Sequence, residues 1–304
     1  MSCPSVEISH IGKHFGRAAP IFRDVCLTIE PGEMVALIGA SGSGKSTLIR
    51  TIAGLTPIDA TPADSAIRIF GNAMQQRGRV TGEAGALRAR VGVIFQQFNL
   101  VSRLSVLTNV MFGLLGQVPR WRGSLGFFTR EEKLLAMRAL QRVGIAEHAL
   151  KRGSELSGGQ QQRAAIARTL LQGADVLLAD EPIASLDPSS ARRVMDIISD
   201  LNGREKITVV ISLHQVEYAL RYCPRTVALR NGGIAYDGPS EKLTPAFLAE
   251  LYGTESDELF LPGLNETSSA AHTAAVDAVS LWDKHAMNGG AVRAREDHSV
   301  AGHA

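Results

Sequence analysis

The chain has 304 residues, of which 45% are hydrophobic, enough to bury one large core or two small ones and too many for a disordered chain. Its 32 lysines and arginines nearly balance its 30 aspartates and glutamates, so the net charge of +2 gives no average attraction to nucleic acid or to a strongly acidic partner. Three scattered cysteines offer neither a disulfide framework nor metal-ligand spacing, which is typical of a reducing compartment such as the cytoplasm.

The first elements of the chain are predicted to be a strand, a loop and a helix. Residues 25–29 partly alternate in polarity, turn residues follow at 30–33, and residues 34–38 are continuously apolar, as in a strand buried on both faces. A glycine-rich turn then leads into a predicted helix over 47–53 that ends at Gly54. No leader-like start and no run of eighteen apolar residues appear, so we expect a chain that does not cross a membrane unaided.

The middle of the chain, residues 108–171, is rich in helix formers, and residues 130–142 carry apolar side chains at helical spacing. Two apolar runs follow at 174–179 and 207–213, on either side of a helical pattern over 189–201. Strand, helix and strand in that order favour parallel pairing in a helix-covered sheet. The sequence therefore predicts an α/β fold with a mainly helical insertion.

The composition changes after Gly253, where periodicity fades. We predict a solvated, disordered tail over 254–304. Four of the eight histidines fall there, but their spacings of thirteen, thirteen and five residues match no compact metal-ligand set.

The glycine-rich turn fits the pattern G-x-x-x-x-G-K-[ST] between a predicted strand and a predicted helix, the context that indicates a P-loop. Glycines let backbone N–H groups wrap a triphosphate, and the helix start adds partial positive charge. Lys45 is expected to reach the β and γ phosphates, and the Ser46 hydroxyl to bind Mg²⁺. The predicted nucleotide-binding residues of this loop are Gly39, Ala40, Ser41, Gly42, Ser43, Gly44, Lys45, Ser46 and Thr47.

Two adjacent carboxylates, Asp180 and Glu181, follow the predicted strand at 174–179. Ligands gather at the carboxyl ends of strands in open α/β sheets. We expect Asp180 to hold the metal through the metal's coordination shell and Glu181 to take a proton from the attacking water. An exposed acidic turn before Pro182 is the alternative, and the P-loop earlier in the chain disfavours it.

The segment LSGGQ at 156–160 precedes a predicted helix over 161–171. Ser157 and Gln160 have the S-x-x-Q spacing of a capping box, which is a purely structural role. Gly158 and Gly159 also leave backbone N–H groups bare at the helix start, and this predicts a second anion-binding site.

Together these segments resemble the nucleotide-binding subunit of an ABC transporter. The resemblance is carried by residues 39–47, 156–160, 176–182 and 185–187 and by His214 at a predicted strand end, and it covers residues 4 to about 253. It implies a P-loop NTPase core with a mainly parallel sheet, an N-terminal antiparallel β subdomain and a helical subdomain at about 97–165, all within an ABC ATPase domain over 1–253. ATP and Mg²⁺ are the implied cofactors.

The resemblance also implies roles for residues that carry little signal alone. Phe15 stands where an aromatic residue stacks on adenine. Gln96 is implied to sense Mg²⁺ and water and to face a membrane partner. His214 is implied to hold the γ-phosphate and Glu181 in place. Taken singly, these three residues could instead be a core aromatic, a strand-end cap and a core histidine.

A further implication of the resemblance is a homodimer that shares its nucleotides. The signature residues Ser157, Gly158, Gly159 and Gln160 would contact the γ-phosphate held by the opposite subunit, with Asp187 at the dimer seam. ATP would then close the dimer and hydrolysis would reopen it, a motion that can drive a bound membrane protein.

The expected membrane partner is a separate permease, because no span is found in the sequence, and this arrangement resembles importers. The implied location is the cytoplasmic face of a bacterial inner membrane, as a peripheral protein without nucleic acid. The segments 95–106, 120–129, 179–188 and 213–223 resemble the phosphonate-importer ATPase in particular, with a periplasmic phosphonate-binding protein as an indirect partner. The segment around Trp121 is the most telling, although an amphipathic surface loop that packs on the helical subdomain is its alternative.

The predicted function is therefore to couple ATP hydrolysis to phosphonate uptake. Two alternatives stay open: an importer ATPase for another small solute, and a non-transport ABC ATPase acting on DNA or ribosomes. The sequence shows neither the long coiled coil nor the second cassette that is common in the latter class. It also lacks the Asn-Lys-x-Asp by which a P-loop GTPase reads guanine.

Overall fold

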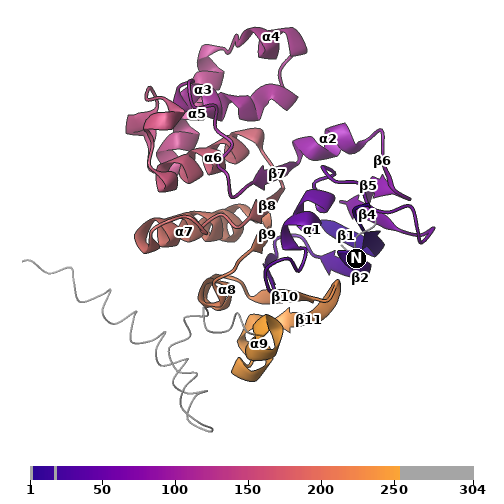
Figure 1. Ribbon diagram of the computed structural model, residues 1–304. Coiled ribbons are helices and arrows are strands. Elements are labelled where there is room, and N and C mark those ends of the chain that lie inside the picture. Colours follow the sequence, from indigo (N-terminus) through magenta and orange to yellow (C-terminus); the bar gives the residue numbers. More distant parts are fainter. Residues whose placement is uncertain (1–2, 17–18, 254–304) are drawn as a thin grey trace, which may run out of the picture. The chain divides into compact units, whose positions relative to one another are not determined.

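The first of two β-sheets is built mainly from the amino-terminal part of the chain. The computed structural model describes residues 3–16 and 19–253, so the predicted tail at 254–304 lies outside the described residues (Figure 1). All pairs in this sheet are antiparallel, which confirms the predicted antiparallel β subdomain. The strand order is β2 (Phe22–Ile29), β1 (Val6–Lys13), β4 (Ala66–Ile69), β5 (Asn72–Gln76) and β6 (Arg79–Val80).

The second sheet is mainly parallel, as predicted. Its strand order is β11 (Gly233–Pro239), β10 (Arg225–Arg230), β3 (Met34–Ile38), β9 (Thr208–Ser212), β8 (Val176–Asp180) and β7 (Val91–Ile94). Neighbours from β10 to β7 run parallel, and the edge strand β11 is antiparallel to β10. Every residue of β3, β8 and β9 is buried, which explains why their sequences are apolar throughout rather than alternating.

Helix α1 (Lys45–Ile52) follows β3 and shares one hydrophobic core with strands of both sheets. It contributes Leu48, Ile49 and Ile52, each fully buried. Burying a side chain of this size contributes about 1.5–3 kcal/mol. The start of α1, which carries Lys45, is therefore anchored by packing along the rest of the helix.

Between β7 and β8 the chain forms a group of helices, in agreement with the predicted helical insertion (Figure 1). Helices α3 (Val106–Met111), α5 (Arg130–Arg142) and α6 (Gly158–Gln172) contact one another, and α4 (Arg120–Leu125) precedes α5. Helix α5 has the predicted bounds because a capping box between Thr129 and Glu132 starts it. The other helical elements are α2 (Ala84–Ala89), α7 (Pro188–Glu205), α8 (Val216–Tyr222), α9 (Pro245–Tyr252) and the 3₁₀ turns η1 (Phe112–Gly116), η2 (Ala146–His148), η3 (Gly153–Glu155) and η4 (Ser240–Lys242).

The topology places four loops at one edge of the parallel sheet. Because β3, β9, β8 and β7 are neighbours and run in the same direction, their carboxyl ends meet at that edge. The predicted P-loop, His214, Glu181 and Gln96 follow these four strands. None of the helices in the described part of the chain is both long and apolar enough to span a bilayer.

Candidate active site

The loop between β3 and α1 has a backbone that only glycine can adopt at two positions. Gly39 has φ +144°, and a Cβ there would lie 2.4 Å from the carbonyl oxygen of Leu229. Gly44 has φ +99°, and its Cβ would lie 2.7 Å from side-chain carbons of Ile21 and Phe22. These close approaches fix the path of the loop. Its backbone N–H groups near the start of α1 are therefore not covered by side chains at these two positions.

Lys45, the first residue of α1, is buried, with only 4% of its surface exposed. Its Nζ donates to the carbonyl oxygens of Gly39 at 2.7 Å and Ala40 at 3.2 Å. The ammonium group is thus held against the loop that is predicted to bind phosphate. Ser46 and Thr47 follow in the first turn of the helix, where both are half-buried.

The acidic pair lies at the end of the neighbouring strand β8. Asp180 is the last residue of β8 and is 3% exposed, and Glu181 follows with a left-handed backbone at φ +49°. Ser212, the last residue of β9, bridges the two: its hydroxyl donates to Asp180 Oδ1 at 3.1 Å and accepts from the Glu181 N–H at 2.9 Å. Two neighbouring strand ends are therefore tied together at the acidic pair.

The Glu181 carboxylate is paired with His214, two residues beyond β9. His214 Nε2 lies 2.6 Å from Glu181 Oε1, and the Glu181 side chain is only 13% exposed. The hydrogen bond from His214 lowers the pKa of Glu181, burial opposes this shift, and the charges of His214 and Lys45 lower the pKa further. Glu181 is therefore ionised at neutral pH and able to accept a proton.

Phe15 and Gln96 lie in exposed loops rather than in the core. Phe15 comes two residues after β1, the residue is 51% exposed, and Lys13 Nζ lies 4.8 Å from the ring centroid. Gln96 comes two residues after β7 and is exposed. His214 is also 42% exposed at its side chain. The alternatives that Phe15 is a core aromatic and His214 a core histidine are therefore wrong.

The signature segment starts helix α6, three residues earlier than predicted. Ser157 Oγ accepts from the Gln160 N–H at 3.3 Å, and Gln160 Oε1 accepts from the Ser157 N–H at 2.9 Å, which confirms the predicted capping box. A Cβ at Gly159 would lie 2.6 Å from Ser190 Oγ on α7. The second glycine is thus required by close packing between the starts of two helices.

Asp187 is the N-cap of α7. Its Oδ1 accepts from the Ser189 N–H at 3.1 Å, the Ser189 hydroxyl at 2.6 Å and the Ser190 N–H at 3.0 Å. These hydrogen bonds, those from Ser189 first, lower the pKa of Asp187. The carboxylate is exposed and remains ionised at neutral pH.

The structure brings the P-loop, the acidic pair and His214 together, because they follow three adjacent strands. The signature segment belongs to a different part of the chain. Helix α6 packs mainly on α5, α3, η1, β7 and α7, whereas α1 packs on β8 and β9. Figure 1 shows α6 within the group of helices, apart from α1.

Comparison with known proteins agrees with this arrangement. The model of a family described as "ABC transporter" matches residues 22–184. A phosphonates import ATP-binding protein, PhnC 1 of Pseudomonas aeruginosa, is 59% identical over 252 residues, covering 83% of this chain and 90% of the relative. PhnC of Paraburkholderia xenovorans is 53% identical over 289 residues, covering 93% of this chain and 95% of the relative. The chain belongs to the ABC transporter family.

The solved structures most informative for this ABC ATPase are cassettes of the same family. The dimeric ATP-binding cassette MJ0796, bound to ADP and Pi, superimposes with a TM-score of 0.67 at 29% identity and covers 77% of this chain and 98% of that chain. The cassette cbiO1 from Clostridium perfringens, part of the transporter complex cbiONQ, gives a TM-score of 0.67 at 24% identity, covering 81% of this chain and 93% of that chain. The predicted ABC ATPase fold and the predicted ATP-hydrolysing activity are thus confirmed.

The residues of the site suit a magnesium-bound nucleotide. Among the described residues, Ser43 Oγ in the loop is buried without a hydrogen-bond partner, as a group that would meet a phosphate oxygen. Asp180 is a buried carboxylate at a strand end, and carboxylate and hydroxyl oxygens are the ligands that Mg²⁺ prefers. The donor set of Ser46 and Asp180 therefore fits the ion.

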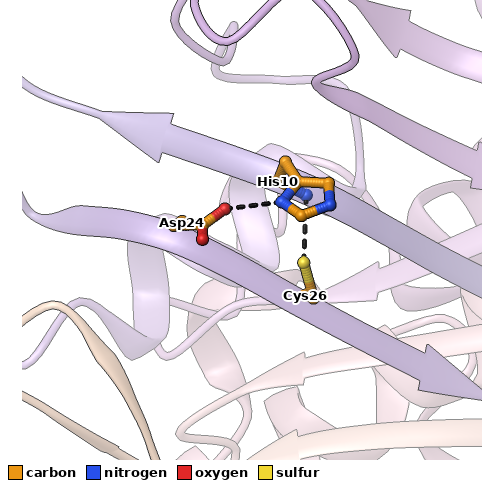
Figure 2. Close-up of side chains that lie close together, drawn as sticks. All are labelled: His10, Asp24 and Cys26. Atoms are coloured by element: carbon orange, nitrogen blue, oxygen red, sulfur yellow. Dashed lines mark hydrogen bonds and ion pairs between the residues drawn. The ribbon is translucent and has the colours of Figure 1, made fainter.

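A second polar cluster lies on the antiparallel sheet, away from the P-loop edge. Figure 2 shows His10 on β1 pointing toward Asp24 and Cys26 on β2. His10 Nδ1 lies 2.7 Å from Asp24 Oδ1, and the backbone N–H of His10 donates to Cys26 Sγ at 3.2 Å. The three residues have the ligand types of a zinc site. Because Nδ1 is engaged by Asp24 and all three residues are exposed, the contact is best described as a hydrogen bond that becomes an ion pair when His10 is protonated.

Ser212 is the site residue that sequence reasoning missed. It is fully buried and contacts both members of the acidic pair, yet no motif marks it. The available signal was a single polar residue near the end of the apolar run 207–213, two residues before His214. Its place at the end of a predicted strand, close to His214 in the sequence, is the signal that could have placed it beside the site.

Proposed function

We propose that this chain is the ATP-binding and ATP-hydrolysing subunit of a phosphonate importer, and that it drives uptake through a separate membrane permease. The reaction is supported by one observation above all, the pairing of Glu181 with His214 at 2.6 Å next to Asp180 and Lys45. The cargo is supported by the 59% identity to a phosphonates import ATP-binding protein over 83% of the chain.

The first task of the site is to hold the triphosphate. The N–H groups of residues 39–47 would bind the β and γ phosphates, and Lys45, held by the carbonyl oxygens of Gly39 and Ala40, would add a positive charge. Because the ammonium group is immobilised before the nucleotide arrives, little reorganisation is needed when charge develops on the γ-phosphate. Phe15, with its exposed ring, would stack on adenine.

The second task is to prepare the attacking water. Glu181 Oε1 accepts the hydrogen bond from His214 Nε2, and the ionised carboxylate would take the proton from water. The pKa of Glu181 is lowered by His214, which keeps the carboxylate ionised and ready as a base. His214 therefore orients the base and keeps it charged.

Ser46 and Asp180 would hold Mg²⁺, with Gln96 sensing the ion and the water. When bound, Mg²⁺ neutralises charge on the phosphate oxygens. Asp180 is well placed because it ends the strand next to β9, which itself neighbours the strand that leads into the P-loop. Asp180 ends a strand of the parallel sheet, and the P-loop, Glu181, His214 and Gln96 follow strands of the same sheet, which sets their relative positions.

The remaining half of the site would come from a second copy of the chain. The signature residues Ser157, Gly158, Gly159 and Gln160 would bind the γ-phosphate of the opposite subunit through the N–H groups at the start of α6. Asp187 would lie at the dimer seam. MJ0796, the cassette with a TM-score of 0.67, was solved as a dimer. ATP then closes the dimer, and hydrolysis reopens it and moves the permease at the cytoplasmic face of the membrane.

Uptake in cells tests the proposal. A bacterial strain without its own phosphonate-importer ATPase, but with the permease and the phosphonate-binding protein, should regain growth on a phosphonate as sole phosphorus source when it expresses this chain. The Lys45→Ala variant, which loses the phosphate-binding ammonium group, is the control and should not restore growth. Failure of the parent chain, expressed at the same level as a PhnC that does restore growth, would contradict the assigned cargo.

A further inference from the structure

We propose that Ser212 is a positioning residue for ATP hydrolysis, which sets the geometry of Asp180 and Glu181 relative to each other. The inference rests on the proposed function and adds to it a residue that touches neither nucleotide nor metal. The buried hydroxyl of Ser212 makes one hydrogen bond to each member of the acidic pair.

The direction of both hydrogen bonds is fixed by chemistry. A backbone N–H can only donate, so the Glu181 N–H uses a lone pair of Ser212 Oγ at 2.9 Å. The hydroxyl proton then points to Asp180 Oδ1 at 3.1 Å. Ser212 has no exposed surface and Asp180 has 3%, so water does not compete for either bond. One rotamer of one side chain thus constrains two residues.

The register of the sheet makes this bridge possible. Asp180 and Ser212 are paired positions of the parallel strands β8 and β9, so their side chains stand on the same face. At this point the strand β8 ends, and Glu181 turns into the left-handed region at φ +49°. A non-glycine residue with this backbone needs a partner that holds it, and the bond from its N–H to Ser212 supplies one.

Glu181 is therefore held at two places, by the last residue of β9 and by His214 two residues beyond it. Ser212 binds its backbone N–H, and His214 binds its carboxylate at 2.6 Å. The first contact holds the backbone of Glu181, and the second holds its side chain. Loss of the Ser212 hydroxyl would free the Asp180 carboxylate and loosen the turn that carries the base. A misplacement of about 1 Å at a reacting group can cost about a hundredfold in rate.

The same strand contains a matched control. Thr208, at the other end of β9, is 1% exposed, and its hydroxyl also bridges one side chain and one backbone N–H: Ser5 Oγ at 2.8 Å and the Gly32 N–H at 3.0 Å. It lies about 13 Å from Ser212 along the strand, at about 3.3 Å per residue. Ser212→Ala and Thr208→Val each remove one buried hydroxyl with two bonds from the same strand, but only the first is next to the acidic pair.

The experiment compares the steady-state ATPase kinetics and the melting temperatures of the parent and these two variants. Both variants should melt at a lower temperature than the parent. Ser212→Ala should lower kcat by about ten- to a hundredfold, with the KM for ATP changed by less than about threefold, because the nucleotide is held by the P-loop. Thr208→Val should keep the parental kcat. Ser212→Thr, which retains the hydroxyl, should restore most of the turnover.

A second readout does not depend on turnover. ATP affinity is measured by calorimetry with excess Mg²⁺ and with a chelator, and the gain in affinity from Mg²⁺ should be smaller in Ser212→Ala than in Thr208→Val, because only the first variant frees Asp180. Equal loss of kcat in both variants, or parental kcat in Ser212→Ala, would overturn the inference. A parent protein that does not hydrolyse ATP at all would instead overturn the proposed function.

Discussion

The two halves of the nucleotide site are built in different ways. The half on the parallel sheet is a connected network: Lys45 is held by loop carbonyls, Asp180 and Glu181 are joined through Ser212, and Glu181 is paired with His214. The half at the start of α6 has a capping box and bare glycines. Under the proposed function, the groups assigned to the chemistry are fixed within one chain, whereas the signature would be offered to a second copy.

The largest effect is expected from the network itself. Glu181→Gln removes the carboxylate that accepts the proton but keeps a side chain of the same size next to His214. Turnover should fall by at least about a hundredfold, the scale of a lost general base, while ATP binding stays intact. Measuring kcat and ATP affinity on the same preparation tests this. Parental turnover would show that the base lies elsewhere.

The next largest effect is expected at the signature segment, residues 156–160, at the start of α6. Ser157→Arg places a bulky cation at the start of α6, so hydrolysis should fall by at least about tenfold, whereas the affinity of the single subunit for ATP should not change. Ser157→Thr, which keeps a capping hydroxyl, is the control and should remain active.

Mixing two variants sharpens this comparison. Lys45→Ala should be inactive because it lacks the phosphate-binding ammonium group, and Ser157→Arg because it lacks the signature. A dimer with one subunit of each variant has one intact site, made from the P-loop of one subunit and the signature of the other. The mixture should therefore regain activity, and a mixture as inactive as its parts would contradict the shared site.

A smaller effect is expected where the signature packs on its neighbour. Gly159→Ala would bring a Cβ to within 2.6 Å of Ser190 Oγ and 2.7 Å of Ser190 Cβ, so one helix start must shift. Overpacking of this kind costs about 1–3 kcal/mol of unfolding free energy. Denaturant unfolding measures it. Adding Ser190→Gly should recover part of the loss and of the activity, and an additive double variant would rule out this contact as the cause.

The smallest effect is expected away from both halves, at His10. The hydrogen bond to Asp24 raises the pKa of His10 above 6.5. A raised pKa in the folded state gives stability that is fully present below about pH 6.5 and is lost as the pH rises through the higher value. His10→Asn should therefore flatten the change of melting temperature with pH in that range, with ATPase activity unchanged. Asp24→Asn should flatten it in the same way if the pair is the cause.

The sequence predicted motifs whose function requires a fixed residue spacing better than it predicted contacts and helix ends that depend on packing. The P-loop and LSGGQ segments were recognisable because phosphate binding requires glycines and a helix start at set positions. The strands β3, β8 and β9 were predicted because burial on both faces leaves continuous apolar runs. Helix ends were less accurate: α6 begins at Gly158 rather than Gln161, because its capping box starts the helix inside the signature.

Other features depend on contacts that a single sequence does not reveal. Ser212 joins Asp180 only because β9 lies next to β8, and this neighbourhood is set by the sheet order. The short strands β4, β5 and β6 were not predicted individually, since they have four, five and two residues. The pairing of His10 with Asp24 arises at a register shift between β1 and β2, and no local sequence pattern predicts this shift.

The order of strands in the parallel sheet also has a consequence for folding during synthesis on the ribosome. β9 is made after β3 and β8 but inserts between them, and it brings both Ser212 and His214. A nascent chain that has not yet reached residue 214 therefore has a P-loop and an acidic pair but no strand to join them. The hydrogen bond and the ion pair that hold Glu181 can therefore form only after residues 212 and 214 have been made.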